Sequence, residues 1–436
     1  MNLGQSIIFV VGLIIGSGIF LKPATLLSST GSTGGALLTW LLGGAITIAS
    51  ALTVAEIAAY IPKIGGLYTY LTELAGKRIA FLFNWAYIII SEPGSVAALC
   101  IAASSFASYF VPMTDLQQKA LSIGLVLILV VTQILSTKGS VWLEVVATIG
   151  KLAPMAIIVV FGTFSGNVGH ISMTPVEAAP AGIGVALLSV LWGYEGWVSC
   201  CAMADDMKNP ARDLPKAIVL GVAVVIFVYV SFSFAIYAVL PADQIVGSSH
   251  IAVDVAVALF GEGGAALITA GMMISVFGSA NAVLACGARN TKAMGEKKQM
   301  LGAETLASLH PKFGTPSAAL IFQGVLTILF ILSGTYDTIT NMLTFTMWIF
   351  YTAGTVCIFK LRKAYKHNPE LYSVPLYPVI PLIGIGGGVF VFFSVLVGDP
   401  LNAVLGVGIT LIGLPIYLWC EKHYGTAEDG KPSLEA

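Results

Sequence analysis

Two short runs of residues lie where backbone groups could bind a small charged molecule. The first is Gly16, Ser17 and Gly18, in the middle of the apolar stretch Phe9 to Leu27. Each glycine weakens a helix by about 1 kcal/mol relative to alanine, so a helix that crosses a membrane here is expected to break. A break at that depth leaves N–H and C=O groups without partners, which hydrocarbon tolerates only where they line a cavity or hold a ligand.

The second run is Trp192 to Trp197, in which Glu195 lies between Gly193 and Gly196 in another apolar stretch. Such a composition is poor for a lipid-facing helix centre, so this helix is also expected to unwind. The two breaks fall in the first and sixth predicted spans, which indicates two five-helix repeats of inverted topology with a ligand between them. The alternative is that the glycines only allow close helix packing. The paired occurrence makes that the weaker explanation.

Backbone groups at two such breaks suit a zwitterion. If the first span runs outward, the N–H groups around Ser17 and Gly18 carry the positive end of a helix dipole, which favours a carboxylate. The carbonyls near Ile14, Trp192 and Gly193 form a negative cluster that suits an ammonium group. An amino group and a carboxylate on one carbon could therefore bridge the two breaks.

Several ionisable residues lie in or near apolar segments. Lys151 stands alone in its span, where an unpaired charge costs at least about 3 kcal/mol, so we expect it to face the protein interior with a functional or conformational role. Glu92 and Glu195 either lie in an aqueous pathway or are protonated, and a structural role fits each equally well. Glu56 and Glu144 lie nearer the ends of spans and are expected to face water.

The composition indicates a polytopic membrane protein. Of the 436 residues, 57% are hydrophobic and only 10% charged, and the mean hydropathy is +0.91. No water-soluble domain could cover such a surface. The six cysteines lie in apolar segments without a CxxC pair, so we expect no disulfide framework, metal or other cofactor. The apolar start lacks a basic segment before it and is expected to be a transmembrane helix, not a signal peptide.

About twelve hydrophobic windows of roughly 20 or more residues predict membrane-spanning helices. They lie at 5–29, 35–61, 79–111, 118–136, 140–163, 181–206, 214–240, 261–292, 316–333, 337–362, 375–398 and 400–422. The connections 242–263 and 295–316 are each expected to hold a short surface helix. The predicted organisation is a first repeat at 1–163, a second repeat at 181–362, two added spans at 375–423 and a disordered tail at 424–436.

The basic residues predict the orientation. With the N-terminus inside, the outer loops hold only Lys22 and Lys119, and Lys151 lies within a span. All the other Lys and Arg residues, of 21 in the chain, fall on the inner side. This bias predicts a multi-pass plasma membrane protein with both termini in the cytoplasm and an even number of spans.

Five features occur together in one known family: the runs 14–20 and 22–23, the loop 62–71, the turn 194–197 and Lys151. In combination they resemble the L-amino acid transporter (LAT) family of the amino acid–polyamine–organocation (APC) superfamily, and within it bacterial alanine–serine–cysteine exchangers. The resemblance covers residues 4 to about 422. It implies a LeuT-like fold of five plus five inverted spans with two added spans, working as a sodium-independent antiporter.

The resemblance also implies substrate-binding residues. Ser17 and Gly18, with Gly16 beside them, match positions whose amides hold the substrate carboxylate. The carbonyls that receive the substrate amino group would be those of Ile14, Trp192, Gly193 and Glu195.

Two further residues gain roles from the resemblance. Trp192 falls where the family has an aromatic gate over the substrate. Lys151 matches a fifth-span lysine that tethers the first span to the eighth, here through Ser279, with its ammonium in the place of a sodium ion.

The sequence departs from the family at two places. Glu195 stands where many members have glycine, which leaves open a proton effect or a changed preference for substrate charge. The loop 111–118 has no cysteine, so we expect no disulfide-linked heavy chain as partner.

The leading hypothesis is exchange of small neutral L-amino acids (alanine, serine, cysteine, and also threonine or glycine) by a protein that is not an enzyme and has no nucleic acid partner. The alternative is a proton-coupled amino acid symporter, for which Glu92 and Glu195 could carry the proton. A carrier of polyamines or cationic amino acids is a third class, which Glu195 supports only weakly.

Overall fold

The computed structural model describes residues 3–63, 65–135, 152–174, 182–198, 207, 209–248 and 250–424, and the regular structure within these ranges is entirely helical. The elements are α1 (Leu3–Ile14), α2 (Gly18–Thr30), α3 (Thr33–Tyr60), α4 (Gly66–Leu74), α5 (Lys77–Ala86), the π-helix η1 (Tyr87–Ser91), α6 (Glu92–Ala107), α7 (Asp115–Leu135), the 3₁₀ turn η2 (Val168–His170), α9 (Ile183–Gly193), α10 (Pro210–Val239), α11 (Ala242–Ile245), α12 (Ile251–Glu296), α13 (Ala303–Ala307), α14 (Ser317–Ser333), α15 (Tyr336–Ala364), α16 (Val379–Gly398) and α17 (Pro400–Tyr424). A further apolar helix spans Leu152–Ser165.

Every predicted hydrophobic window contains one of these helices. Within the described ranges, eight helices are long and apolar enough to cross a membrane, and α1 and α2 together pass the same test as one bent span. The shorter apolar helices Leu152–Ser165, α9 and α14 occupy the three remaining windows. The predicted all-α membrane fold class is confirmed, while the count of twelve spans and the inverted repeats stay predictions.

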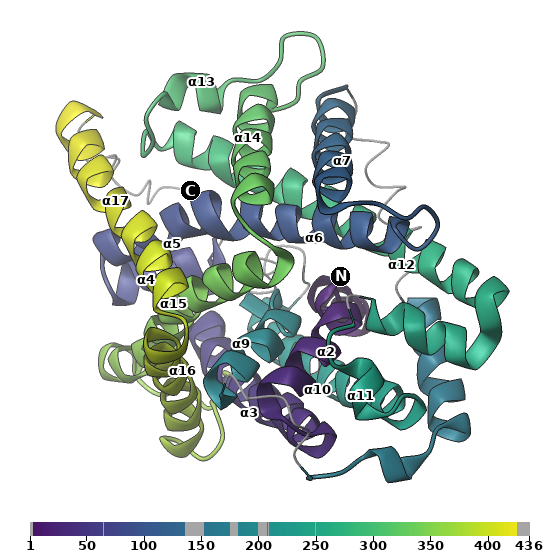
Figure 1. Ribbon diagram of the computed structural model, residues 1–436. Coiled ribbons are helices and arrows are strands. Elements are labelled where there is room, and N and C mark those ends of the chain that lie inside the picture. The colour runs from purple at the N-terminus through teal and green to yellow at the C-terminus, as the bar shows by residue number, and fades with distance from the viewer. Residues whose placement is uncertain are drawn as a thin grey trace.

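The helices pack around a central element, α6. Figure 1 shows α6 across the middle of the molecule, with α7 and α14 on one side and α2, α3 and α9 on the other. Helix α6 packs against α12, and α3 packs against α10 and α16. The two halves of the bent span have different main neighbours: α1 packs chiefly against α10, and α2 chiefly against α9.

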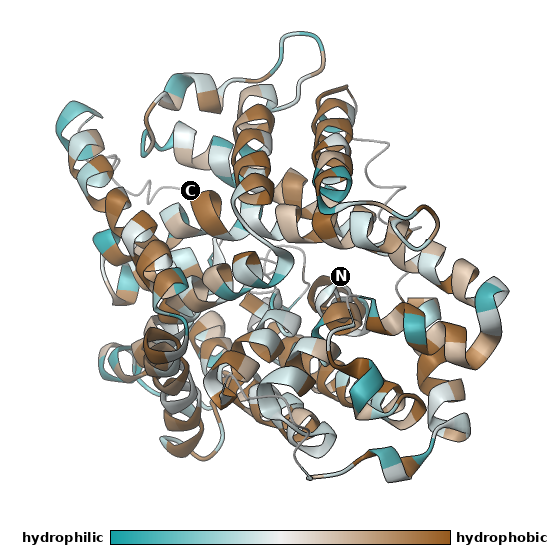
Figure 2. Ribbon diagram, in the orientation of Figure 1, coloured by the Kyte–Doolittle hydropathy of each residue, from teal (hydrophilic) through white to brown (hydrophobic). Residues whose placement is uncertain are grey.

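The outer helices carry the apolar surface. In Figure 2, hydrophobic residues dominate α7 and α14. Their outward side chains include Val131 and Leu329, which are 54% and 56% exposed. Large contiguous apolar faces of this kind are unfavourable in water and suit lipid hydrocarbon.

Short helices lie in both long connections, as predicted. The connection after α10 contains α11 and the first turns of α12, which are separated from the rest of α12 by the non-helical backbone of Gly261. The connection after α12 contains α13.

Two expectations about charged residues are wrong. Lys22, expected in an outer loop, lies within α2 and is fully buried. Its ammonium donates to Asp337 Oδ1 at 2.6 Å and to Thr340 Oγ1 at 2.8 Å, so the charge is paired inside the protein. Glu56, expected to face water, is only 2% exposed because Arg362 neutralises it with two hydrogen bonds. Glu144 lies outside the described residues.

Candidate functional site

The first predicted break separates α1 from α2. Helix α1 ends at Ile14, α2 begins at Gly18, and their axes are bent by 51°. Tyr229 of α10 braces the gap, because its hydroxyl donates to the Ile14 carbonyl at 3.1 Å and accepts from the backbone of Gly16. The first amides of a helix have no acceptor within it. The amides at the start of α2, beginning with Gly18, therefore face the gap.

The second predicted break begins where α9 ends, at Gly193. A turn follows, in which the backbone N–H of Glu195 donates to the Trp192 carbonyl at 3.1 Å and Gly196 has φ of 108°. That φ favours glycine, since other residues rarely adopt it. Residues 199–206 lie outside the described ranges, so whether the sixth span resumes as a second half-helix stays a prediction.

The two breaks touch each other. A Cβ on Gly18 would lie 3.1 Å from Cα of Gly193, and one on Gly196 would lie 2.9 Å from the carbonyl oxygen of Leu13. Only glycine allows backbones to approach this closely. The N-terminal end of α2 and the C-terminal ends of α1 and α9 thus meet at one place, so opposite helix-dipole ends face one volume.

That volume is a cavity of about 190 Å³. Every predicted substrate-binding residue lines it, and so does Ser279, whereas Lys151 lies outside the described residues. The lining residues are Leu13, Ile14, Ile15, Gly16, Ser17, Gly18, Tyr87, Ser91, Glu92, Ser95, Leu99, Trp192, Gly193, Glu195, Gly196, Ser279, Ala282, Val283 and Cys286. The volume is below the roughly 300–1,000 Å³ of pockets for drug-sized molecules, so it suits a small ligand.

The wall opposite the breaks comes from α6 and the π-helix before it. One π-helical turn, Tyr87–Ser91, precedes Glu92, and such turns are frequent at functional sites. Ser91, Glu92 and Ser95 reach the cavity from this wall. From the residues alone, the role of Glu92 was open between function and structure. The π-helical turn before it is a feature that hydropathy does not predict.

Two carboxylates face the cavity. Glu92 Oε1 accepts from Asn290 at 2.7 Å, and Glu195 Oε1 accepts from the Tyr351 hydroxyl. The second oxygen of Glu92 is buried and has no donor within the described part of the chain, whereas the Glu195 carboxylate also accepts from the backbone N–H of Gly196. No group of three or more His, Cys, Asp or Glu side chains is placed to hold a metal ion in the described ranges.

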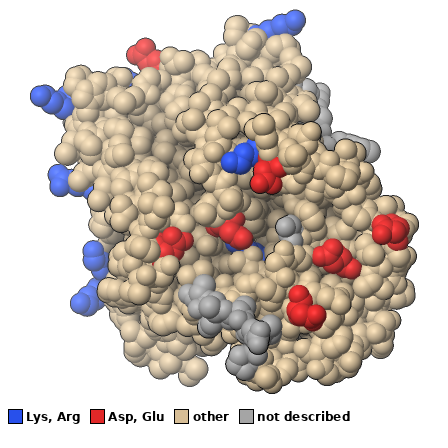
Figure 3. All heavy atoms as spheres, viewed as in Figure 1, with Lys and Arg blue, Asp and Glu red and all other residues tan. Residues whose placement is uncertain are grey.

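A hydrogen-bonded cluster that was not predicted from the sequence joins two of the residues that line the cavity, Ser17 and Trp192. The Tyr336 hydroxyl lies 3.1 Å from Ser17 Oγ and accepts from Trp192 Nε1 at 3.0 Å. The Lys22–Asp337 ion pair lies beyond it along α2. The available signals were a lysine within an apolar run and a Tyr-Asp pair at the start of a span. Figure 3 shows a central hollow in one face of the molecule, with Asp and Glu side chains around it.

These features define a class: an all-helical membrane protein with a small cavity that lies beside a bent span and the end of α9, as expected of secondary transporters. The amino acid permease family model matches residues 1–419. The chain belongs to this family, and the resemblance to LAT transporters of the APC superfamily is confirmed.

Three relatives illustrate the match. The serine/threonine exchanger SteT of Bacillus subtilis (strain 168) is 38% identical, over 95% of this chain and 95% of its own length. The b(0,+)-type amino acid transporter 1 of Mus musculus is 29% identical, over 92% of this chain and 83% of its own length. The cystine/glutamate transporter of Homo sapiens is 28% identical, over 97% of this chain and 86% of its own length.

Proposed function

We propose that the chain is an antiporter that exchanges small neutral L-amino acids across the plasma membrane by alternating access. The observation that carries this proposal is the contact between the two breaks at Gly18 and Gly193. Amides at the start of α2 would bind the substrate carboxylate, and carbonyls at the ends of α1 and α9 would bind its ammonium group. The names of the three relatives, each an exchanger or a transporter of amino acids, support amino acids as the substrates.

The size and lining of the cavity support alanine, serine, cysteine, threonine and glycine as substrates. Backbone groups would bind the amino and carboxylate groups that all amino acids share. The residues that line the cavity would therefore determine which side chains fit. Ser91, Ser95 and Ser279 line the cavity with hydroxyl groups, which suits small side chains with or without a hydroxyl or thiol.

Two features of the cavity support alternating access. Tyr336 bonds two of its lining residues, Ser17 and Trp192, and would act as a gate on that side. The cavity is also lined by the exposed Cys286 of α12. On the predicted topology, Cys286 is on the cytoplasmic side, so this conformation would be inward-facing.

Several further parts of the proposal rest on the sequence and the family. Lys151 would tether the first span to the eighth through Ser279 and take the place of a coupling sodium ion. The chain would have twelve spans in two inverted repeats with two added, cytoplasmic termini and no disulfide-linked heavy chain. Lys151→Ala is expected to fold but to exchange poorly, and near-normal exchange by the purified variant would remove the tether.

The test is uptake of labelled alanine or serine into proteoliposomes. Vesicles preloaded with unlabelled alanine are expected to take up label, and empty vesicles are not. Equal uptake into empty vesicles would reject obligatory exchange. Uptake into empty vesicles that requires an imposed pH gradient would instead establish a proton-coupled symporter.

A further inference from the structure

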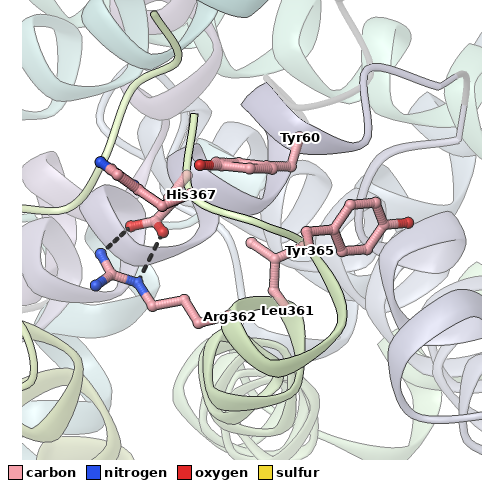
Figure 4. Close-up of a pocket in the computed structure, with 6 residues that line it drawn as sticks. Tyr60, Leu361, Arg362, Tyr365 and His367 are labelled. Carbon is pink, nitrogen blue, oxygen red and sulfur yellow. Dashed lines mark hydrogen bonds and ion pairs between the residues drawn. The ribbon is translucent and has the colours of Figure 1, made fainter. Parts of the chain in front are cut away.

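A second pocket lies at the far end of α3 from the substrate cavity. It has a volume of about 140 Å³ and lies between the end of α3, the end of α15 and the connection to α16 (Figure 4). Its lining residues are Glu56, Tyr60, Leu361, Arg362, Tyr365 and His367. The basic-residue bias places this end of the molecule at the cytoplasmic surface.

The one acidic side chain of the pocket is already neutralised. Glu56 Oε1 accepts from Arg362 Nε at 2.9 Å, and Oε2 accepts from Arg362 Nη2 at 2.8 Å and from the backbone N–H of Val374 at 2.7 Å. Figure 4 shows the carboxylate facing the guanidinium. Both oxygens are used, so Glu56 has little capacity left to bind a cation.

The polar groups that remain are hydrogen-bond donors. Arg362 has a second terminal nitrogen that neither Glu56 bond uses. The Tyr60 oxygen accepts from the backbone N–H of Asn368 at 3.0 Å, which leaves its own proton to donate. The imidazole of His367 lies beside the side chains of Arg362 and Tyr60 (Figure 4). A pocket of donors around a guanidinium favours an anion with several oxygens.

Exposed positive charge lies close to the pocket in sequence. Lys360 and Lys363 lie in the last turns of α15 and Lys366 follows its end, and all three are exposed, while Glu370 is the one acidic residue in 360–370. Basic pockets at the cytoplasmic ends of spans bind anionic lipid headgroups, and each nearby Lys or Arg adds to that attraction.

The chain beside Arg362 has the character of the membrane interface. Leu376, three residues before α16, and Val379, its first residue, are 74% and 54% exposed. Tyr377 between them packs its ring 3.8 Å from the Arg362 guanidinium. Aromatic rings beside exposed aliphatic side chains are typical of headgroup depth. An anion that binds at this depth would therefore carry hydrocarbon chains.

We propose that this pocket binds the phosphate headgroup of an anionic phospholipid from the cytoplasmic leaflet. The phosphate accepts from Arg362, Tyr60 and His367, and the acyl chains lie along Leu376 and Val379. The bound lipid joins the end of α3 to the α15–α16 connection. A ligand that binds only the folded protein stabilises it, so occupancy raises the unfolding temperature.

The test compares lipids added to the purified full chain in detergent, with thermal unfolding and native mass spectrometry as readouts. The probes are dioleoyl phosphatidylglycerol, dioleoyl phosphatidylcholine and inorganic phosphate. The test variants are Lys363→Gln/Lys366→Gln, which removes two exposed charges, and Tyr60→Phe, which removes a donor without a change of charge. The matched control is Lys216→Gln/Lys312→Gln, which removes two exposed charges elsewhere on the predicted inner side.

Phosphatidylglycerol is expected to raise the unfolding midpoint of the wild type and the control, and phosphatidylcholine is not. The lysine variant should need about 30-fold more phosphatidylglycerol for the same shift, since it loses two charges worth about 1 kcal/mol each. Tyr60→Phe should retain less phosphatidylglycerol in the mass spectrum. Equal responses to the two lipids, or equal losses in the control, would overturn the site. A shift by inorganic phosphate as large as that by phosphatidylglycerol would overturn its assignment to lipid. None of these outcomes depends on amino acid transport.

Discussion

The indole N–H of Trp192 donates to the hydroxyl of Tyr336 at 3.0 Å, and the same hydroxyl lies 3.1 Å from Ser17 Oγ. One hydroxyl therefore joins the second break, the first break and the start of α15. Ser17 and Trp192 also line the cavity. On the proposed mechanism, the junction closes the cavity on this side, and both hydrogen bonds break when it opens.

Tyr336→Phe should shift the protein away from the inward-facing conformation. The two lost hydrogen bonds are worth about 1 kcal/mol each, which corresponds to a population change of about 10- to 30-fold. The measurement is the alkylation rate of Cys286, which lines the cavity and is exposed. The variant is expected to react more slowly than wild type at this residue, with Tyr424→Phe as a matched control and Cys286→Ser as the measure of labelling at the other five cysteines. An unchanged rate would show that the junction does not hold the cavity closed.

The Lys22–Asp337 ion pair should respond asymmetrically to mutation. Lys22 is fully buried, whereas the Asp337 side chain is 46% exposed. Asp337→Asn leaves a buried charge without its partner, which costs about 3–5 kcal/mol, while Lys22→Met leaves a carboxylate that water can reach. The unfolding midpoint of Lys22→Met should therefore be higher than that of Asp337→Asn. The double variant Lys22→Met/Asp337→Asn should also unfold at a higher temperature than Asp337→Asn. The reverse ranking would mean that Lys22 is hydrated.

Gly18→Ala should reduce exchange without loss of the fold. The added methyl group would lie 3.1 Å from Gly193 Cα and from the Trp192 ring. Overpacking of this kind costs about 1–3 kcal/mol, which corresponds to about 5- to 150-fold in rate. Gly12→Ala is the control, since a Cβ at that position would meet no other part of the protein within 4 Å. Gly12→Ala should keep full exchange in proteoliposomes. Equal exchange by both variants would contradict the close contact of the breaks.

His250 should make stability depend on pH. It lies before α12, its Nδ1 is 2.9 Å from Ser105 Oγ, and burial lowers its pKa, against the opposing effect of Asp254. The unfolded chain therefore binds a proton at a higher pH than the folded chain. The stability is fully present above the unfolded pKa of about 6.5 and is lost as pH falls toward the lowered value. The unfolding midpoint should drop between about pH 7.5 and pH 5.5, and His250→Gln should reduce that drop. An identical pH profile for His250→Gln would exclude His250 as the cause.

The sequence predicted the positions of the helices better than the side-chain contacts between them. Apolar length alone located a helix in each predicted window, and the paired glycines pointed to the residues that line the cavity. Lys22 and Glu56 were misplaced because their partners, Asp337 and Arg362, are about 300 positions away in the chain, and hydropathy cannot report a pairing. Tyr336 was missed for the same reason, since its role comes from contacts with two distant breaks.

On the proposed function, peptide groups at the two breaks bind an amino group and a carboxylate on one carbon. The most direct measurement is competition against labelled alanine on the purified protein by L-alanine, propionate, ethylamine and alanine methyl ester. L-alanine alone should compete, because each of the other compounds lacks one of the two charges. Competition by propionate or by the methyl ester at the concentrations that suffice for L-alanine would contradict the account.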